Sequence, residues 1–243
     1  MNNTIKELME RKSIRVFLDK EISKEDKETI LTCAMNAPSA GNQQMYTIID
    51  VTDQKLKEEL VKTCDNQPFI AQGKMVLIFC ADFYKWYKGF EETDSGPRTP
   101  GVGDMLIATS DANIAAQNAV VAAHSLGIGS CYIGDIMENY EKQRELLGLP
   151  EFVFPCAMLV FGYPTDQQLA RPKPARAPLD KIVHENRYNL MTPEERKVLF
   201  SNNIRDRDYV EWMNKFCDWK YNSPFSKELT RSVKKYIDDF KGE

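Results

Sequence analysis

Short apolar runs alternate with amphipathic stretches along this chain, and the alternation predicts a fold that mixes strands and helices. Brief apolar runs bounded by turn residues are typical of buried strands; they cover residues 46–51, 74–81, 130–133 and 156–161. Apolar residues at helical spacing predict helices; these begin near residues 4, 23, 53, 104, 138, 192, 208 and 225. The pattern contains no repeat and no linker between large domains.

Polar residues fix several of the predicted helix starts. Thr4, followed three residues later by a glutamate, has the pattern of a capping box. Ser23 is expected to cap a helix that must end before Pro38. Asp53 is expected to cap the next helix, and Thr192 with the proline after it is a typical helix start.

Two stretches depart from ordinary amphipathic patterning. Residues 83–103 are polar, aromatic and rich in Gly and Pro, which predicts a long irregular loop or a mobile lid. The helix predicted over residues 104–126 has apolar residues on all sides, among them Leu106, Ile107, Ile114, Ala115, Val120 and Val121. A helix of this kind is buried all round, either in a large core or between subunits.

Composition narrows the class of protein. The chain has 243 residues, 42% hydrophobic and 28% charged, with a net charge of -4, which is ordinary globular composition for one domain or one domain with an appendage. A mildly acidic chain is a poor general nucleic-acid binder. No apolar run is long enough for a membrane span, and residues 1–15 do not resemble a secretory signal. The six cysteines form no C-x-x-C pair, so we expect reduced thiols in the cytoplasm.

Several kinds of active site are excluded by the motifs. His124 and His184 are too far apart for a helical metal pair and no cysteines cluster, so we expect no metal. The chain has neither a G-x-S-x-G elbow nor a Walker loop. The Gly127-Ile128-Gly129 sequence follows a helix and precedes a strand, the reverse of the Rossmann order, so it predicts a turn.

The stretch Arg11-Lys12-Ser13-Ile14-Arg15 follows the first predicted helix. If it is extended, Arg11, Ser13 and Arg15 share one side, because side chains alternate along a strand. Two guanidinium groups flanking a hydroxyl would make a phosphate clamp. The alternative is a solvated basic turn.

Three more segments have possible binding chemistry. Residues 37–44 are dense in turn formers and amides, which suit the donor and acceptor edge of a heterocycle, or they form a plain loop. Gly134 follows a predicted strand, where a backbone N–H can approach a flat ligand. Arg171, Lys173 and Arg176 make a local basic bias, which either completes an anion site or forms a solvated loop.

Taken together, these segments resemble the FMN-dependent nitroreductase family over about residues 5–190. The resemblance rests on the R-x-S-x-R stretch, the Ala-Pro-Ser-Ala-Gly-Asn-Gln loop and Asn66-Gln67. It also includes the stretches at residues 111–118 and 126–130, and residues 172–179 followed by Ile182-Val183-His184. The resemblance implies an α+β fold: a central mixed, mostly antiparallel sheet flanked by helices in an intertwined homodimer.

The resemblance also implies roles for individual residues. Arg11, Ser13 and Arg15 would hold the FMN phosphate and ribityl chain, with Arg15 reaching the pyrimidine side of the ring. The partner subunit would supply Pro38, Ser39 and Asn42. Asn66 or Gln67 would meet the pyrimidine edge, Ile133 and Gly134 would line the ring, and Arg176 with Lys173 would meet the phosphate. Because the sequence has Gly134-Asp135 where some members have an acid followed by glycine, it leaves substrate positioning open.

The function that follows is an NAD(P)H-dependent FMN oxidoreductase. NADH or NADPH would reduce the flavin, and a planar electrophile such as a nitroaromatic or quinone would then be reduced in a second half-reaction. No catalytic side chain is assigned; Arg15 would act electrostatically on the flavin. The alternatives are a flavin-binding sensor or carrier without turnover, and a flavin enzyme of this fold that does not use nicotinamide.

Two aromatic segments lie outside the family motifs. The aromatic residues of 83–100 either stack on the acceptor or pack the loop down. Residues 191–243 are predicted to form a helical extension of the 1–190 domain, and their aromatic density suggests that they pack on the same domain or on the partner and border the pocket.

Overall fold

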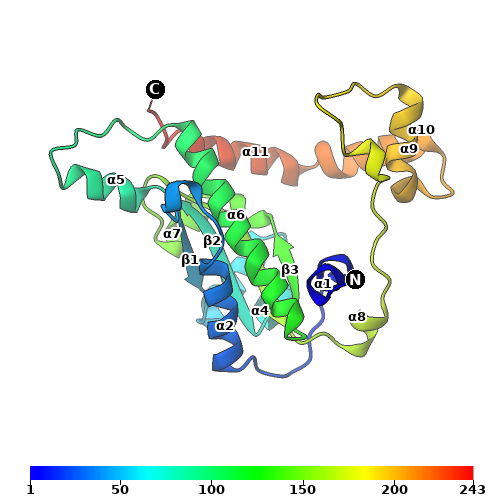
Figure 1. Ribbon diagram of the computed structural model, residues 1–243, viewed down its shortest axis with the longest axis horizontal. Coiled ribbons are helices and arrows are strands. Elements are labelled where there is room, and N and C mark those ends of the chain that lie inside the picture. The colour runs from blue at the N-terminus through cyan, green and yellow to red at the C-terminus, as the bar shows by residue number, and fades with distance from the viewer. Residues whose placement is uncertain (243) are drawn as a thin grey trace. The chain divides into compact units, whose positions relative to one another are not determined.

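The computed structural model describes residues 1–242 (Figure 1). They form two compact units, one made of residues 1–171 together with those from 228 onward, the other of residues 172–227. The assignment of residues 191–243 to a C-terminal extension stays a prediction.

The first unit is built on an antiparallel sheet. Its strands are β1 (Tyr46–Asp50), β2 (Met75–Asp82), β3 (Gly129–Ile133) and β4 (Val153–Gly162), in the order β1-β2-β4-β3. Every residue of β2 and β4 is buried, so these central strands are covered on both faces. The α+β class is confirmed, and the four predicted strands are found within a few residues of their expected bounds.

One face of the sheet is covered by α6 (Val102–Ser125), with α2 (Lys24–Met35) beside it (Figure 1). Small side chains let α6 pack closely; its buried alanines are Ala108, Ala112, Ala115, Ala116, Ala119 and Ala123. Leu106, Ile107 and Ile114 are exposed on the same helix. The chain's own core therefore does not bury this helix on all sides, and burial of these residues between subunits stays a prediction.

The remaining helices of this unit are shorter. They are α1 (Asn3–Glu10), α3 (Gln54–Thr63), α4 (Phe69–Gln72), α5 (Tyr84–Glu91), α7 (Tyr140–Leu147) and α8 (Asp166–Ala170), with the 3-10 helices η1 (Ala40–Asn42) and η2 (Asp135–Met137). Ser23 and Asp53 cap their helices as predicted. The prediction of a capping box at Thr4 is wrong, because Asn2 caps α1 by accepting from the Ile5 N–H.

The prediction of a long loop over residues 83–103 is also wrong in part, because α5 occupies its first half. Phe83 at the N-cap makes no side-chain capping bond. Tertiary contacts hold this helix instead: the Trp86 indole Nε1 donates to the Gln43 carbonyl at 2.8 Å, and Tyr87 packs edge-on against Phe152 with ring centroids 5.2 Å apart. Of the two roles predicted for these aromatic residues, the contacts favour packing.

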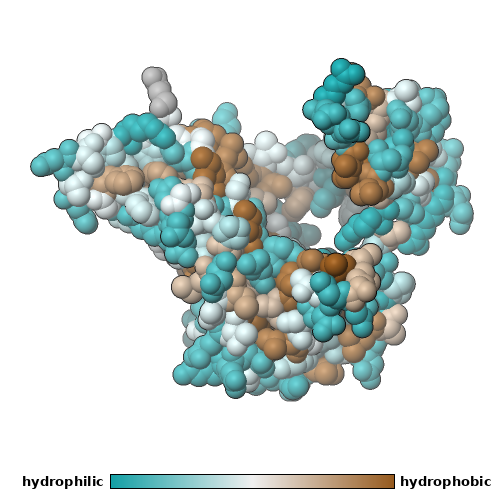
Figure 2. Space-filling view, viewed as in Figure 1, coloured by the Kyte–Doolittle hydropathy of each residue, from teal (hydrophilic) through white to brown (hydrophobic). Residues whose placement is uncertain are grey.

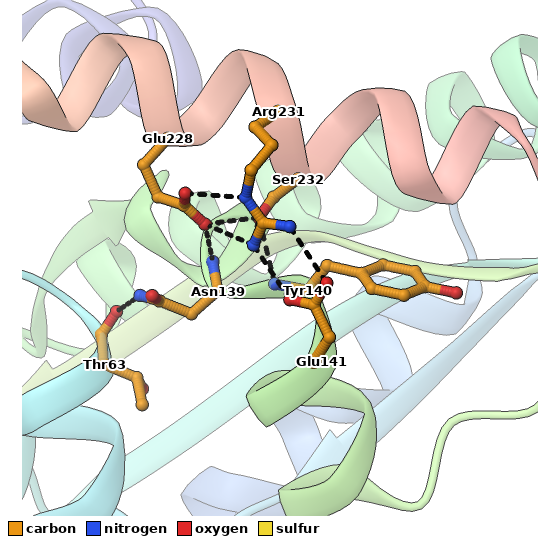
Figure 3. A network of polar contacts seen from close by, with 7 residues as sticks. All are labelled: Thr63, Asn139, Tyr140, Glu141, Glu228, Arg231 and Ser232. Carbon is orange, nitrogen blue, oxygen red and sulfur yellow. Dashed lines mark hydrogen bonds and ion pairs between the residues drawn. The ribbon is translucent and has the colours of Figure 1, made fainter.

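The chain returns to the first unit through α11 (Pro224–Ile237), whose residues from 228 onward belong to it. Tyr236 and Phe240 are buried there, and the Tyr236 ring lies 5.0 Å from that of Phe154. Arg231 joins α11 to the start of α7 through Glu141 and Glu228 (Figure 3). Tyr236 and Phe240 are thus part of this core.

The second unit consists of η3 (Leu179–Lys181), α9 (Pro193–Ile204), α10 (Tyr209–Phe216), the π-helix η4 (Cys217–Tyr221) and the first turn of α11. The predicted start of α9 is confirmed, since Thr192 and Glu195 form a reciprocal capping box. Trp212 stacks on Phe216 with ring centroids 4.8 Å apart. Within residues 1–242 no helix has both the length and the apolarity to cross a bilayer.

Candidate functional site

The segment between α1 and α2 lies along the free edge of β3. Ser13 forms a parallel bridge with Ser130, and the Ile14 N–H donates to the Ser130 carbonyl at 2.9 Å. Gly129 makes this approach possible, because a Cβ there would lie 2.6 Å from the Ile14 side chain. Ile14 is buried, so the residues on either side of it point away from the core.

Arg11, Ser13 and Arg15 gather around Cys131 of β3. Burial raises the pKa of the Cys131 thiol, and it is opposed by the positive charge of Arg15, a hydrogen bond with Ser13 and the charge of Arg11. The Arg11 charge also opposes the raising of the Tyr132 pKa by burial. The structure therefore brings the three predicted residues together beside the edge strand.

Arg11 has unused binding capacity. Its Nη1 is buried and has no hydrogen-bond partner anywhere in residues 1–242. A buried donor without a partner is costly, and a guanidinium group is suited to bidentate contact with phosphate or carboxylate. An anionic group at this position would satisfy the donor, so this cluster fits the phosphate of FMN.

Arg171, which the sequence placed in the basic stretch of residues 171–176 with its two possible roles, is a member of this cluster. Its Nη2 donates to the Ser13 carbonyl, and Lys12 Nζ donates to the carbonyls of Leu169 and Arg171. These bonds fasten the clamp segment to the end of α8. The basic bias of residues 171–176 was a signal for Arg171, but residue type alone could not show that it holds the backbone of Ser13.

The end of β3 presents Gly134 to solvent. Its φ of −80° is ordinary, and an added Cβ would meet only the Met137 methyl at 3.7 Å. Neither backbone strain nor packing requires glycine here, which leaves room for a flat ligand against the backbone. Ile133 differs from the expectation, because its side chain is buried, so a ligand can meet only its backbone.

The turn that holds Asn66 and Gln67 packs close to Gly134. The Asn139 side chain donates to the Thr63 carbonyl at 2.9 Å, and α3 contacts η2, which begins directly after Gly134. Gln67 uses its amide N–H on the Cys64 carbonyl at 3.1 Å, whereas Asn66 is exposed. Both predicted amides therefore lie near the same end of β3.

The loop with Pro38, Ser39 and Asn42 leads into β1, which is the opposite edge of the sheet from β3. Within one chain, β2 and β4 therefore separate the strand that follows this loop from β3, the strand beside the Arg11 cluster. Pro38 and Asn42 are exposed, and Ser39 Oγ accepts from the Gln44 N–H at 3.1 Å. The sequence analysis also missed Asp111 of α6, whose carboxylate binds this loop.

Lys173 and Arg176 belong to the second unit. Arg176 is exposed, and its carbonyl accepts from the Asn202 amide at 2.5 Å. Their role at the phosphate stays a prediction. Among residues 1–242 no group of His, Cys, Asp and Glu is arranged to hold a metal ion.

Comparison with known proteins identifies the family to which this antiparallel α+β core, with its basic segment along the edge strand, belongs. The model of the nitroreductase family matches residues 8–163, so this chain belongs to the nitroreductase family.

Individual relatives match over nearly the whole chain. An FMN reductase (NADPH) of Bacillus subtilis is 31% identical, over 99% of this chain and 96% of its own. An oxygen-insensitive NADPH nitroreductase of Salmonella typhimurium is 35% identical over 82% and 79%. Among solved structures, B. megaterium NfrA2 covers 100% of both chains with 32% identity and a TM-score of 0.83. NADPH:FMN oxidoreductase of Vibrio harveyi, complexed with NAD+, has 25% identity and a TM-score of 0.81, covering 97% and 98%.

Proposed function

We propose that this chain is an FMN-dependent oxidoreductase that uses NADH or NADPH as reductant and works as a homodimer. The observation that supports it best is the clustering of Arg11, Ser13 and Arg15 on the free edge of β3, with a buried Arg11 nitrogen that has no partner in residues 1–242. The names of the Bacillus subtilis and Salmonella relatives agree with this chemistry.

The clamp residues would hold FMN at its phosphate end. Arg11 and Ser13 would bind phosphate oxygens, with Arg171 fixing the backbone of the clamp beneath them. Lys173 and Arg176 would add positive charge. Bound FMN would supply the hydride-transfer chemistry between the nicotinamide and the acceptor.

The remaining residues would position the ring. Arg15 is exposed beside Cys131 and would place a positive charge near the pyrimidine side, which favours the anionic reduced flavin. The backbone at Gly134 and Ile133 would meet the ring face. Asn66 is the better placed of the two amides, because Gln67 already donates to Cys64.

The homodimer is proposed from the surface of the first unit. Leu106, Ile107 and Ile114 of α6 are exposed, as are Ile5 and Leu8 of α1, and Figure 2 shows apolar patches along these helices. Contiguous exposed apolar surface is typical of an interface. Pro38, Ser39 and Asn42 sit at the sheet edge away from the clamp, so in this dimer they would complete the partner's flavin site.

The proposed acceptor is a small planar electrophile, a nitroaromatic or a quinone. The proposed compartment is the cytoplasm, since free thiols such as those of Cys64, Cys80 and Cys156 persist in reducing surroundings.

Anaerobic stopped-flow mixing tests the function. The purified yellow protein is mixed with NADH or NADPH, and flavin absorbance is followed; we expect rapid bleaching, then reoxidation by a quinone or nitroaromatic. A yellow protein that neither nucleotide bleaches would favour a flavin carrier or a nicotinamide-independent enzyme. A protein that does not take up FMN would overturn the proposal altogether.

A further inference from the structure

The loop between α2 and β1 has a backbone that needs outside support. Gly41, Asn42 and Gln44 all have positive φ, at 57°, 55° and 49°. Residues other than glycine adopt this left-handed region at a cost, so neighbouring groups must stabilise it. The loop also presents Ser39 and Asn42, two of the residues that we propose for flavin binding.

Asp111 supplies that support from the middle of α6. Asp111 is buried, at 3% exposure, and its two carboxylate oxygens bind the loop at two points, Ala40 and Met45. Oδ1 accepts from the Ala40 N–H at 3.0 Å, and Oδ2 accepts from the Met45 N–H at 3.3 Å. Within residues 1–242 no lysine, arginine or histidine forms an ion pair with it. The buried negative charge therefore depends on these two N–H groups.

The other bonds of the loop do not replace this contact. The Gln44 N–H donates to Ser39 Oγ within the loop, and the Gln44 amide donates to the Met35 carbonyl at 3.1 Å, which joins the loop only to the end of α2. The Trp86 indole donates to the Gln43 carbonyl from α5. Among the described residues, Asp111 alone ties the loop at both Ala40 and Met45 to the long central helix.

The position of Asp111 on α6 relates the loop to the proposed dimer interface. Ile107 lies four residues before it and Ile114 three residues after it, so the three share one side of the helix. Both isoleucines are exposed, at 47% and 41%, while Asp111 is covered by the loop. The loop therefore lies on the apolar stripe that we propose faces the second subunit.

We propose that Asp111 is a positioning residue that holds Ser39 and Asn42 in place for the flavin bound by the partner subunit. This inference rests on the proposed function. The carboxylate itself does not contact the flavin; it fixes the path of the loop across the interface, and each flavin site takes its clamp from one chain and its Asp111-supported loop from the other.

Mixed dimers test the inference. Chains with Asp111→Asn and chains with Arg11→Met, bearing different tags, are purified as homodimers and as the mixed dimer, and FMN is titrated into the apo-proteins. Each homodimer should bind FMN about 10- to 100-fold more weakly than wild type. The mixed dimer should bind one FMN per dimer with wild-type affinity, because one site has both changes and the other has neither.

The outcomes separate this inference from the proposed function. Two equally weakened sites in the mixed dimer would mean that Asp111 serves its own chain's site, and would overturn the inference. An Asp111→Asn homodimer with wild-type affinity would also overturn it, leaving the proposed function intact. A wild-type protein that does not bind FMN would overturn both.

A second variant covers misfolding of Asp111→Asn. Ala40→Pro removes one N–H that Asp111 accepts, at the first position of η1, where proline is tolerated, after Ser39 in extended conformation. It should weaken FMN binding in the same mixed-dimer pattern but by a smaller factor, and wild-type affinity would contradict the inference. Asp94→Asn, at an exposed loop position, controls for charge, and the mild core change Ile70→Val controls for stability.

Discussion

Two arginine clusters of the first unit differ in whether their guanidinium groups already have hydrogen-bond partners. Arg231 donates through Nε to Glu228 at 2.8 Å and through Nη1 and Nη2 to Glu141 at 2.9 and 2.8 Å (Figure 3). Glu228 also accepts from the Asn139 N–H and from Ser232 Oγ, so the cluster satisfies itself. Arg11 lies near Arg15 rather than beside a carboxylate, and no atom of residues 1–242 accepts from its buried Nη1.

The difference separates a structural arginine, Arg231, from Arg11, which we propose binds an anion. A guanidinium group paired with carboxylates from two helices joins those helices, and α11 is held to α7 in this way. A guanidinium group without a carboxylate partner retains its capacity for an external anion. The number of arginines in a region is thus less informative than which of their nitrogens already have partners.

The largest effect is expected for Arg11→Met. FMN should bind about 10- to 100-fold more weakly, because a charge-assisted hydrogen bond contributes about 1.5–3 kcal/mol. The melting temperature of the apo-protein should not fall, since the variant removes a buried donor without a partner. Fluorescence titration of apo-protein with FMN measures the affinity. Lys6→Met, an exposed change of equal charge on α1, should leave it unchanged; an equal loss there would mean that the effect is general electrostatics.

Arg15→Ala should have a smaller, more specific effect. It should weaken FMN binding several-fold and lower the two-electron potential of the bound flavin by about 20–40 mV, because a positive charge that stabilises the reduced flavin is lost. Spectroelectrochemical titration measures this potential. An unchanged potential at full occupancy would exclude the electrostatic role of Arg15.

Arg231→Met tests the structural half of the comparison. The melting temperature should fall by a few degrees, because the variant leaves Glu141 and Glu228 facing each other without a cation between α7 and α11. FMN affinity should stay at the wild-type value. Lys24→Met, which removes an exposed ion pair with Glu28, should leave the melting temperature nearly unchanged. A large loss of FMN affinity in Arg231→Met would contradict the separation of the two clusters.

The smallest effect is a pH dependence of the Arg231 cluster. Hydrogen bonds from Arg231 hold the pKa of both Glu141 and Glu228 at about 2, below the ordinary glutamate value. A carboxyl with a lowered folded-state pKa stabilises the fold above its unfolded pKa and loses that contribution as the pH falls toward the folded one. Stability should therefore fall between about pH 4.5 and 2 more steeply in wild type than in Arg231→Met. Equal slopes in urea denaturation over this range would refute the assignment.

Local sequence signals predicted the regular elements where the local chemistry is sufficient. Residue type was enough to predict the caps at Ser23, Asp53 and Thr192, and the turn at Gly127, whose φ is 75°. The predicted cap at Thr4 was wrong because Asn2, two residues earlier, is an equally good capping residue and accepts from the Ile5 N–H. The helix α5 has no cap signal and depends on its contacts with Gln43 and Phe152.

The sequence was enough to group some residues of the candidate site but not to show how the fold brings them together. Arg11, Ser13 and Arg15 could be grouped by alternation alone, since an extended segment puts them on one side. Their placement along β3 depends on Ile14 fitting over Gly129, and on Arg171 reaching the Ser13 carbonyl across a long sequence distance. Asp111 lies in the stretch of residues 111–118 that contributes to the family resemblance, and only the fold shows which loop its carboxylate binds.

Because Ile14 packs over Gly129, a substitution at Gly129 should change cofactor affinity without changing any charged residue. A single methyl group at this position would clash with the Ile14 side chain and push residues 11–15 away from β3. Such a chain should bind flavin more weakly although it keeps every arginine.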